Sequence, residues 1–191
     1  MLFKKKRNYL KQMYKQNPDT NAYVVEVSLD NYNEVFNGWD PSPIKRRDLD
    51  PEFLEFIYQC SQDIPIKAPV ELAFYMPKDQ YDEAKEQLTK DGILNNFNFI
   101  VMNIRKELKN SQRKIMMYIV MSMFFLTMAY FFRQKVDNSI FTTILLEGMF
   151  VGGWVFLWEA FSLFFFTDQE TLSKMKKIKR FIDTPINFNY Q

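Results

Sequence analysis

The sequence predicts an α+β domain of two or three strands with helices, fused to an antiparallel hairpin of two transmembrane helices. Two apolar runs predict the hairpin: residues 115–132 carry no charge, and residues 140–166 form a second, longer run. As helices, these runs rise about 27 Å and about 40 Å, whereas the hydrocarbon of a bilayer is about 30 Å thick. Residues 1–114 instead mix charged and apolar side chains and contain two short stretches typical of strands.

Composition shifts divide the chain into segments. The N-terminus is basic but has no apolar run behind it, so it does not fit a signal peptide. The expected segments are a basic N-terminal segment (1–20), a cytoplasmic α+β domain (21–98), a helical connector (99–114), transmembrane helix 1 (115–132), an external loop (133–139), transmembrane helix 2 (140–166) and a basic cytoplasmic tail (167–191).

Strands in the cytoplasmic domain are predicted where apolar and β-branched residues gather. Residues 21–29 are rich in valine, and residues 67–77 form a second apolar stretch that a proline stops. The tail alternates apolar and polar residues over 186–190 and is expected to add a third strand. Because two strands alone are marginally stable, we expect an antiparallel or mixed sheet completed by this strand or by a partner subunit.

Helix boundaries in the same domain follow from capping residues. Asp50 before Pro51 is a favourable N-cap and first-turn pair, and the helix is expected to reach about Ser61. Asp30 is expected to cap a short helix that ends at Gly38. A further helix is expected to start near residues 78–79, to break or kink around residue 92, and to resume toward the first span.

Basic residues predict the direction of the spans. Five precede the first span and five follow the second, whereas the linker carries only Arg133 and Lys135. Both termini are therefore expected in the cytoplasm of a cell-membrane protein, and the flanks are expected to contact anionic lipids.

Composition also excludes several classes of site. The chain has no histidine and one cysteine, Cys60, which argues against Ser-His-Asp triads, Cys-His pairs, disulfides and most zinc sites. The net charge of +2 is too small to predict a nucleic-acid partner. No cofactor or metal is expected, and no nucleophile–base constellation predicts an enzyme.

The segment WDPSPIKRRDLD is the densest polar cluster. Arg46 and Arg47 are candidates for contact with a phosphate or another anion. Asp40, Asp48 and Asp50 are expected to order the loop and cap the following helix, because their spacing does not match an EF-hand. An enzyme acting at the bilayer surface through this loop is the weakest alternative.

One face of the second span is polar. At about 100° per residue, less than half of the helix circumference carries the two acids, a serine and two glycines: Glu147, Glu159, Ser162, Gly148 and Gly152. Gly148 and Gly152 form a GxxxG motif, which permits close helix packing in membranes. This face is expected to meet protein, with the first span as the nearest partner and a second subunit next, while the opposite face meets lipid.

Hydroxyl groups of the first span are expected at the levels of the two acids. Thr127 and Tyr130 are expected near Glu147, and Tyr118 and Ser122 near Glu159, so that they donate hydrogen bonds. The acids then fasten helices together, line a path for ions or protons, or reach water at shallow depth.

The chain resembles a family of uncharacterised prokaryotic membrane proteins with a cytoplasmic domain and a two-span hairpin. The resemblance lies in DPSP…RDLD (Asp40 to Asp50) and EGMFVGGWVFLW (Glu147 to Trp158), which stand in the same order and at similar spacing. Members tend to have Arg-Pro after the tryptophan, where this chain has Glu159 and Ala160. The resemblance implies an architecture and no reaction.

These observations predict a non-enzymatic, homo-oligomeric membrane protein whose cytoplasmic domain mediates assembly or senses a protein partner. The alternative is an oligomeric ion channel in which Glu147 and Glu159 line the path.

Overall fold

The computed structural model describes Leu10, residues 12–134 and residues 139–191. The chain forms two compact units. We call Met1–Asn103 with Lys174–Gln191 the sheet unit, and Ile104–Ser173 the helix unit. The predicted external loop at 133–139 lies mostly outside the described residues, as does most of the first half of the basic segment 1–20.

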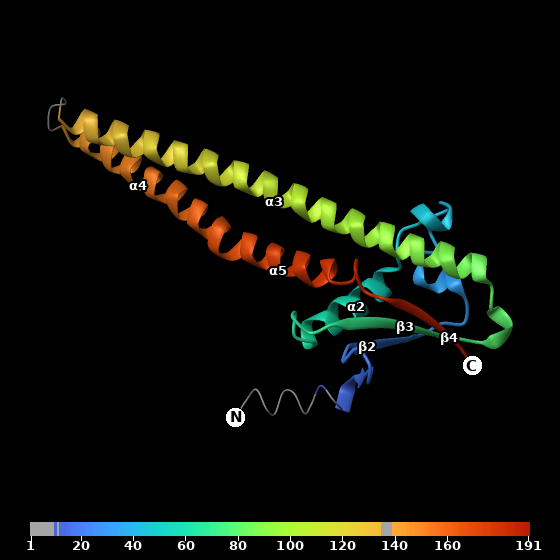
Figure 1. The fold of residues 1–191 in the computed structure, drawn as a ribbon. Coiled ribbons are helices and arrows are strands. Elements are labelled where there is room, and N and C mark those ends of the chain that lie inside the picture. The colour runs from blue at the N-terminus through green and yellow to red at the C-terminus, as the bar shows by residue number, and fades with distance from the viewer. Residues whose placement is uncertain (1–9, 11, 135–138) are drawn as a thin grey trace. The chain divides into compact units, whose positions relative to one another are not determined.

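Four strands form one sheet in the sheet unit, in the order β1-β2-β3-β4. Their bounds are Lys15–Gln16 (β1), Tyr23–Ser28 (β2), Val70–Met76 (β3) and Ile186–Tyr190 (β4). β1 runs antiparallel to β2, whereas β2, β3 and β4 are parallel, so the sheet is mixed. Figure 1 shows β2, β3 and β4 side by side. The α+β class and the tail strand are thus confirmed, whereas β1 is a fourth strand that was not predicted and lies in the basic N-terminal segment.

Short helices and α2 connect β2 to β3. The 3₁₀ helices are η1 (Tyr32–Val35) and η2 (Ile44–Arg46), and α2 spans Pro51–Asp63. The short helix was predicted to be capped by Asp30 and to end at Gly38, and both ends were wrong. Asn31 is the N-cap of η1, and Phe36 already has an extended backbone. The side chain of Asn31 accepts a hydrogen bond from the Asn33 N–H at 2.9 Å, which fixes the start of the turn.

A second connection, from β3 to β4, contains the long helices. It comprises η3 (Lys78–Gln80), α3 (Glu83–Arg133), α4 (Ile140–Ser162), the π-helical segment η4 (Leu163–Thr167) and α5 (Asp168–Lys179). The helix unit is therefore an insertion between two neighbouring parallel strands. The predicted connector 99–114 and the first span 115–132 both lie within α3.

The predicted break at Gly92 was also wrong, because α3 continues through it. A Cβ atom at Gly92 would lie 2.7 Å from the Ile44 carbonyl oxygen and 2.9 Å from Cζ of Phe36. The glycine therefore permits the loop before α2 to pack directly on the backbone of α3, and its role is close approach rather than helix termination.

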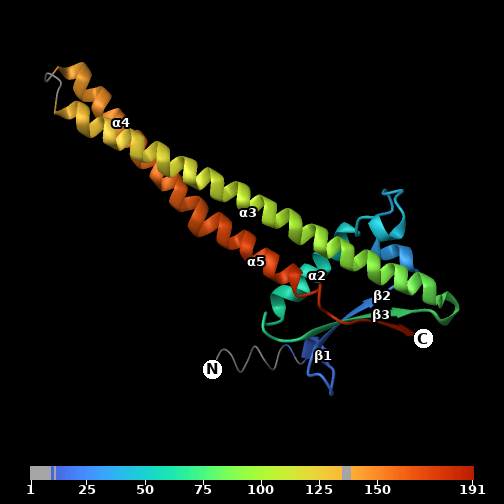
Figure 2. The same ribbon diagram turned by 45° about the horizontal axis from the view of Figure 1, so that its top comes forward.

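The core of the sheet unit lies on one face of the sheet. Alternate strand residues such as Val25, Leu72 and Phe74 are fully buried there. Facing them are buried residues of α2, of the first part of α3 and of the C-terminal segment: Phe53, Ile57, Cys60, Ile93, Phe97, Val101, Ile178 and Phe181. Figure 2 shows α2 over this face and β1 at the far edge of the sheet.

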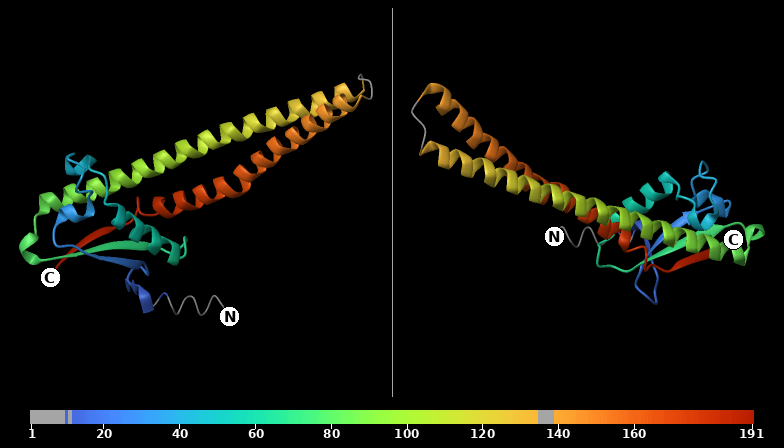
Figure 3. Two further views of the ribbon diagram at one scale, coloured as in Figure 1. Left: turned by 180° about the vertical axis from the view of Figure 1, so that it is seen from behind. Right: turned by 90° about the horizontal axis from the view of Figure 1, so that it is seen from above.

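The helix unit consists of a long helix pair. Two helical stretches, Glu83–Arg133 and Ile140–Lys179, are long and apolar enough to cross a membrane. Both views in Figure 3 show α4 running alongside the C-terminal half of α3. The second stretch continues past the predicted span end at residue 166, through the π-helical segment into α5.

Candidate functional site

Small residues and one aromatic cluster mediate the contact of α4 with α3. A Cβ atom at Gly153 would lie 2.7 Å from Cγ of Leu126 and 3.3 Å from its backbone nitrogen, so the two helices approach closely there. The Phe156 ring stacks on Tyr118 and Phe125, with ring centroids 6.1 and 5.6 Å apart. The buried small residues recur at a spacing of seven: Ser122 and Ala129 on α3, Gly153 and Ala160 on α4.

This contact uses the side of α4 that the sequence assigned to lipid. Measured around the helix from Glu147, the contact residues Phe156, Ala160 and Gly153 lie at about 180°, 220° and 240°. Gly148 and Gly152 have no heavy atom within 4 Å of a built Cβ. The expectation that the glycine face packs on the first span was therefore wrong, and the GxxxG motif is uncovered within the described chain.

Glu147 and Glu159 both lie on this uncovered face and are exposed. Glu147 lines a groove of about 460 Å³ together with Tyr130, Arg133 and Thr143. No described residue donates a hydrogen bond to either glutamate or forms an ion pair with it within 4 Å. Tyr130 thus lies at the level expected from the sequence, but Arg133 does not pair with the acid.

The remaining predicted intramembrane residues are scattered. Ser122 is fully buried between the helices, and its Oγ has no hydrogen-bond partner among the described residues. Tyr118 uses its ring for packing, Thr127 is exposed, and Ser162 is half-buried at the end of α4. The expected hydroxyl–carboxylate bonds from Thr127, Tyr118 and Ser122 are absent from the described part of the chain. Glu147 lines the groove beside α3 without bonding to it, and Glu159 is exposed.

In the sheet unit, the predicted Asp/Arg loop is held by its own side chains. Asp40 accepts hydrogen bonds from the Ser42 and Asp48 N–H groups at 2.9 and 2.8 Å, and these bonds, that from Asp48 first, lower the pKa of Asp40. Nε of Arg47 donates to the Ser42 carbonyl at 3.0 Å, so Arg47 helps to order the loop. Asp48 contributes through its backbone N–H and C=O.

Two other residues of that loop have distinct places. Asp50 is the N-cap of α2 and accepts from the N–H groups of Glu52 and Phe53 at 2.8 and 3.2 Å. Arg46 is exposed and lines a shallow hollow of about 390 Å³ with Lys45 and Asp48, so its predicted contact with an anion stays a prediction. The loop is fastened to α3 by Asn96, whose amide donates to the Arg47 carbonyl at 2.7 Å.

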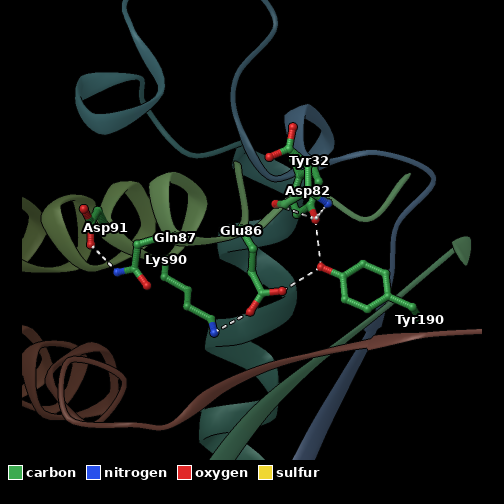
Figure 4. Close-up of polar contacts among 7 residues, drawn as sticks. All are labelled: Tyr32, Asp82, Glu86, Gln87, Lys90, Asp91 and Tyr190. Atoms are coloured by element: carbon green, nitrogen blue, oxygen red, sulfur yellow. Dashed lines mark hydrogen bonds and ion pairs between the residues drawn. The ribbon is translucent and has the colours of Figure 1, made fainter. Parts of the chain in front are cut away.

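A polar network at β4 was not anticipated from the sequence. The Tyr190 hydroxyl lies 2.7 Å from the Tyr32 hydroxyl and donates to Glu86 Oε2 at 2.7 Å, and Lys90 pairs with Glu86 Oε1 at 2.7 Å (Figure 4). Burial, followed by the bonds with Tyr32 and Glu86, raises the pKa of Tyr190. Burial raises the pKa of Glu86, but the bonds from Lys90 and Tyr190 outweigh it and leave the pKa below its ordinary value.

A second unanticipated residue is Arg180, which follows α5. Its guanidinium donates to the carbonyls of Ile64 and Ala68 at 3.1 and 2.6 Å, and more weakly to Pro65 at 3.3 Å. Burial lowers the pKa of Arg180. A cation at the C-terminus of α2 is favoured by the helix dipole, so Arg180 ties the C-terminal segment to that helix. The only signal in the sequence was the basic cluster, which was assigned to topology.

Cys60 is buried in the core, and burial raises its pKa. Within the described residues, no three Asp, Glu or Cys side chains gather in a way that would hold a metal ion. Comparison of the chain with protein-family models, with curated proteins and with solved structures gives no match. The resemblance to a two-span membrane family therefore stays a prediction.

Proposed function

We propose that the chain is an integral protein of the cell membrane that assembles into a homo-oligomer through the Gly148–Gly152 face of α4. In this proposal α3 and α4 form an antiparallel transmembrane hairpin, and both termini lie in the cytoplasm with basic flanks at anionic lipids. The sheet unit then provides assembly contacts or senses a protein partner, without catalysing a reaction.

One observation carries the proposal: the close-approach glycine of the helix pair is Gly153, so the GxxxG motif has no partner among the described residues of its own chain. Nothing lies within 4 Å of a Cβ built at Gly148 or Gly152. In lipid, helices associate through van der Waals packing at small residues, because burial of apolar surface gives no net gain there. A second copy of α4 is the simplest helix that fits this face.

The two acids on the same side strengthen the choice of a protein rather than lipid as the neighbour. Twelve residues separate Glu147 from Glu159, so they lie about 18 Å apart along the helix. A charged carboxylate facing hydrocarbon costs several kcal/mol unless it is paired or hydrated. An interface between copies supplies polar neighbours or water to both.

The subunit count tests this proposal. Wild-type protein in nanodiscs is expected to give a dimer or larger assembly by native mass spectrometry, and Gly148→Leu with Gly152→Leu is expected to shift the population toward smaller assemblies. Because no atom of the described residues lies within 4 Å of a Cβ at either position, both side chains start in open space, and helicity and thermal stability should be retained. Gly153→Ala, which overlaps Leu126, should lower stability and leave the subunit count unchanged. A wild-type monomer, or assemblies indifferent to both leucines, would refute the proposal.

An oligomeric ion channel is the second candidate, favoured by the exposure of both acids on the uncovered face. If copies meet through this face with water between them, Glu147 and Glu159 line the path. Cation flux into liposomes should then fall with Glu147→Gln and with Glu159→Gln, while a matched Glu170→Gln change in α5 should not affect it. If the flux is unchanged by both substitutions, or if no flux is measured, the protein is not a channel of this kind.

A further inference from the structure

β4 forms one end of the sheet, and no described strand lies beyond it. The Leu72 N–H donates to the Pro185 carbonyl, and the Gln191 N–H donates to the Met76 carbonyl, both at 3.0 Å. In a parallel ladder such bonds alternate along the strand, so the residues at odd positions from 185 to 191 face β3. The N–H and C=O groups of residues 186, 188 and 190 therefore point to the open edge.

The described residues of β4 itself include no charge, proline or bulge that would prevent pairing. Exposed edge strands are commonly protected by proline, lysine, bulges or a covering helix. The five residues of β4, INFNY, contain no charged residue and no proline, and each pairs with β3 without a bulge. An edge of this kind is suited to accept another strand.

Side chains also hold the strand rigidly in place. The Phe188 ring stacks on Phe74 with centroids 4.9 Å apart, and Lys90 Nζ lies 5.6 Å from the Phe188 centroid. Tyr190 is fixed by Tyr32 and Glu86, as Figure 4 shows. Little conformational entropy remains to be lost when a partner strand docks, which lowers the cost of association.

We propose that β4 pairs in an antiparallel arrangement with β4 of a second copy, centred on Phe188, to join two sheets into one. A two-fold axis at Phe188 places Ile186 opposite Tyr190 of the other copy and Asn187 opposite Asn189. Residues 186, 188 and 190 then form hydrogen-bonded pairs, in which each residue exchanges both backbone bonds with its counterpart.

The sequence of the strand is what selects a second copy as the occupant. In this register every apolar side chain meets an apolar one on the core-facing side, and every asparagine meets an asparagine on the open side. Cross-strand pairs of matched character stabilise a sheet, and no like charges oppose each other. The pairing rests on the homo-oligomer proposed above and gives it an interface in the sheet unit.

Disulfide trapping tests the register in full-length protein reconstituted in nanodiscs. In a Cys60→Ser background, chains with Asn187→Cys and chains with Asn189→Cys carry different tags and are mixed, then oxidised. The proposed register puts these Cα atoms about 4.5 Å apart, within the range of a disulfide, so mixed dimers should form. Asn187→Cys alone should cross-link at least tenfold less, because its own counterpart lies about 8 Å away.

Charge variants at the exposed positions 187 and 189 provide an independent readout, because substitutions there do not disturb the core. Asn187→Lys with Asn189→Lys opposes like charges twice and should weaken β4-dependent association at least tenfold, measured with labelled chains at low salt. Asn187→Lys with Asn189→Asp opposes unlike charges and should restore it. If the protein assembles but shows neither the mixed cross-link nor this charge dependence, the β4 interface is wrong and the proposed homo-oligomer still stands. A wild-type chain that is monomeric in nanodiscs overturns the proposed homo-oligomer as well.

Discussion

Replacement of Gly92 by alanine should destabilise the sheet unit, although the same change stabilises an ordinary helix. Position 92 lies inside α3, where alanine is favoured over glycine by about 1 kcal/mol. The added methyl group, however, would lie 2.7 Å from the Ile44 carbonyl oxygen and 2.9 Å from Cζ of Phe36. Favourable contacts between such atoms occur at about 3.5–4.0 Å, so both neighbours must move.

The magnitude follows from which atoms have to move. Overpacking of a core costs about 1–3 kcal/mol, and the upper end applies here because the obstacle is a backbone carbonyl. Displacing that segment also stretches the bonds between Asn96 and the loop, at 2.7 Å to the Arg47 carbonyl and 3.3 Å from the Leu49 N–H. After the gain in helix propensity is subtracted, we expect a net loss of about 2 kcal/mol.

The single cysteine provides a specific assay for this loss. Cys60 is 4% exposed, and it is the only cysteine in the sequence, so its labelling by a thiol reagent reports opening of the sheet unit. A loss of about 2 kcal/mol should accelerate labelling roughly 30-fold at a matched denaturant concentration.

A control for helix propensity is Asn98→Ala, at an exposed position of the same helix. That change gains helix propensity and removes a hydrogen bond to the Leu94 carbonyl one turn earlier, so labelling should stay at or somewhat below the wild-type rate. If Gly92→Ala labels at the wild-type rate or more slowly, close packing of the loop on α3 is not the reason for the glycine.

Three further changes test the sheet unit by the same labelling assay or by its Tm. Arg180→Ala leaves the carbonyls of Ile64 and Ala68 without their donor and should cost about 2 kcal/mol or more, partly recovered in Arg180→Lys. Because the folded pKa of Glu86 is lowered, its contribution is complete above the ordinary pKa of about 4.3 and is lost as pH falls through the folded value. The Tm should therefore hold from pH 7 to about 5 and decline below about 4, with a smaller decline in Glu86→Gln; an equal decline would contradict the assignment. Asp50→Ala should cost about 1 kcal/mol, whereas Asp50→Asn should cost little.

Local signals in the sequence were sufficient for several elements. The start of α2 was predictable because Asp50 and Pro51 act within one turn of the helix. β4 was predictable because its five residues alternate between the two sheet faces. The two apolar helices were predictable from length and composition alone, since a helix satisfies its own backbone hydrogen bonds.

Other features depend on neighbours far along the chain. Gly92 looked like a helix break, because nothing near it in sequence reveals the Ile44 carbonyl against which it packs. Tyr190 and Arg180 find their partners 104 and 116 residues away, at Glu86 and Ile64.

The face of α4 was misassigned because polarity was taken as the mark of the intramolecular contact. The seven-residue spacing of small residues, Ser122 to Ala129 and Gly153 to Ala160, was the better signal. Neither glutamate takes part in that contact: both are exposed, and Glu147 only borders the groove beside α3.

The insertion of the helix unit between β3 and β4 has a consequence for biosynthesis. β3 ends at Met76 and β4 begins at Ile186, so at ordinary translation rates about 5–20 s pass between their emergence. During that interval the nascent chain holds β3 with one bare edge, and the core lacks Ile178 and Phe181. The sheet unit therefore becomes fully stable only after both long apolar helices have been made. Completion of the sheet and of its core thus follows synthesis of the entire helix unit.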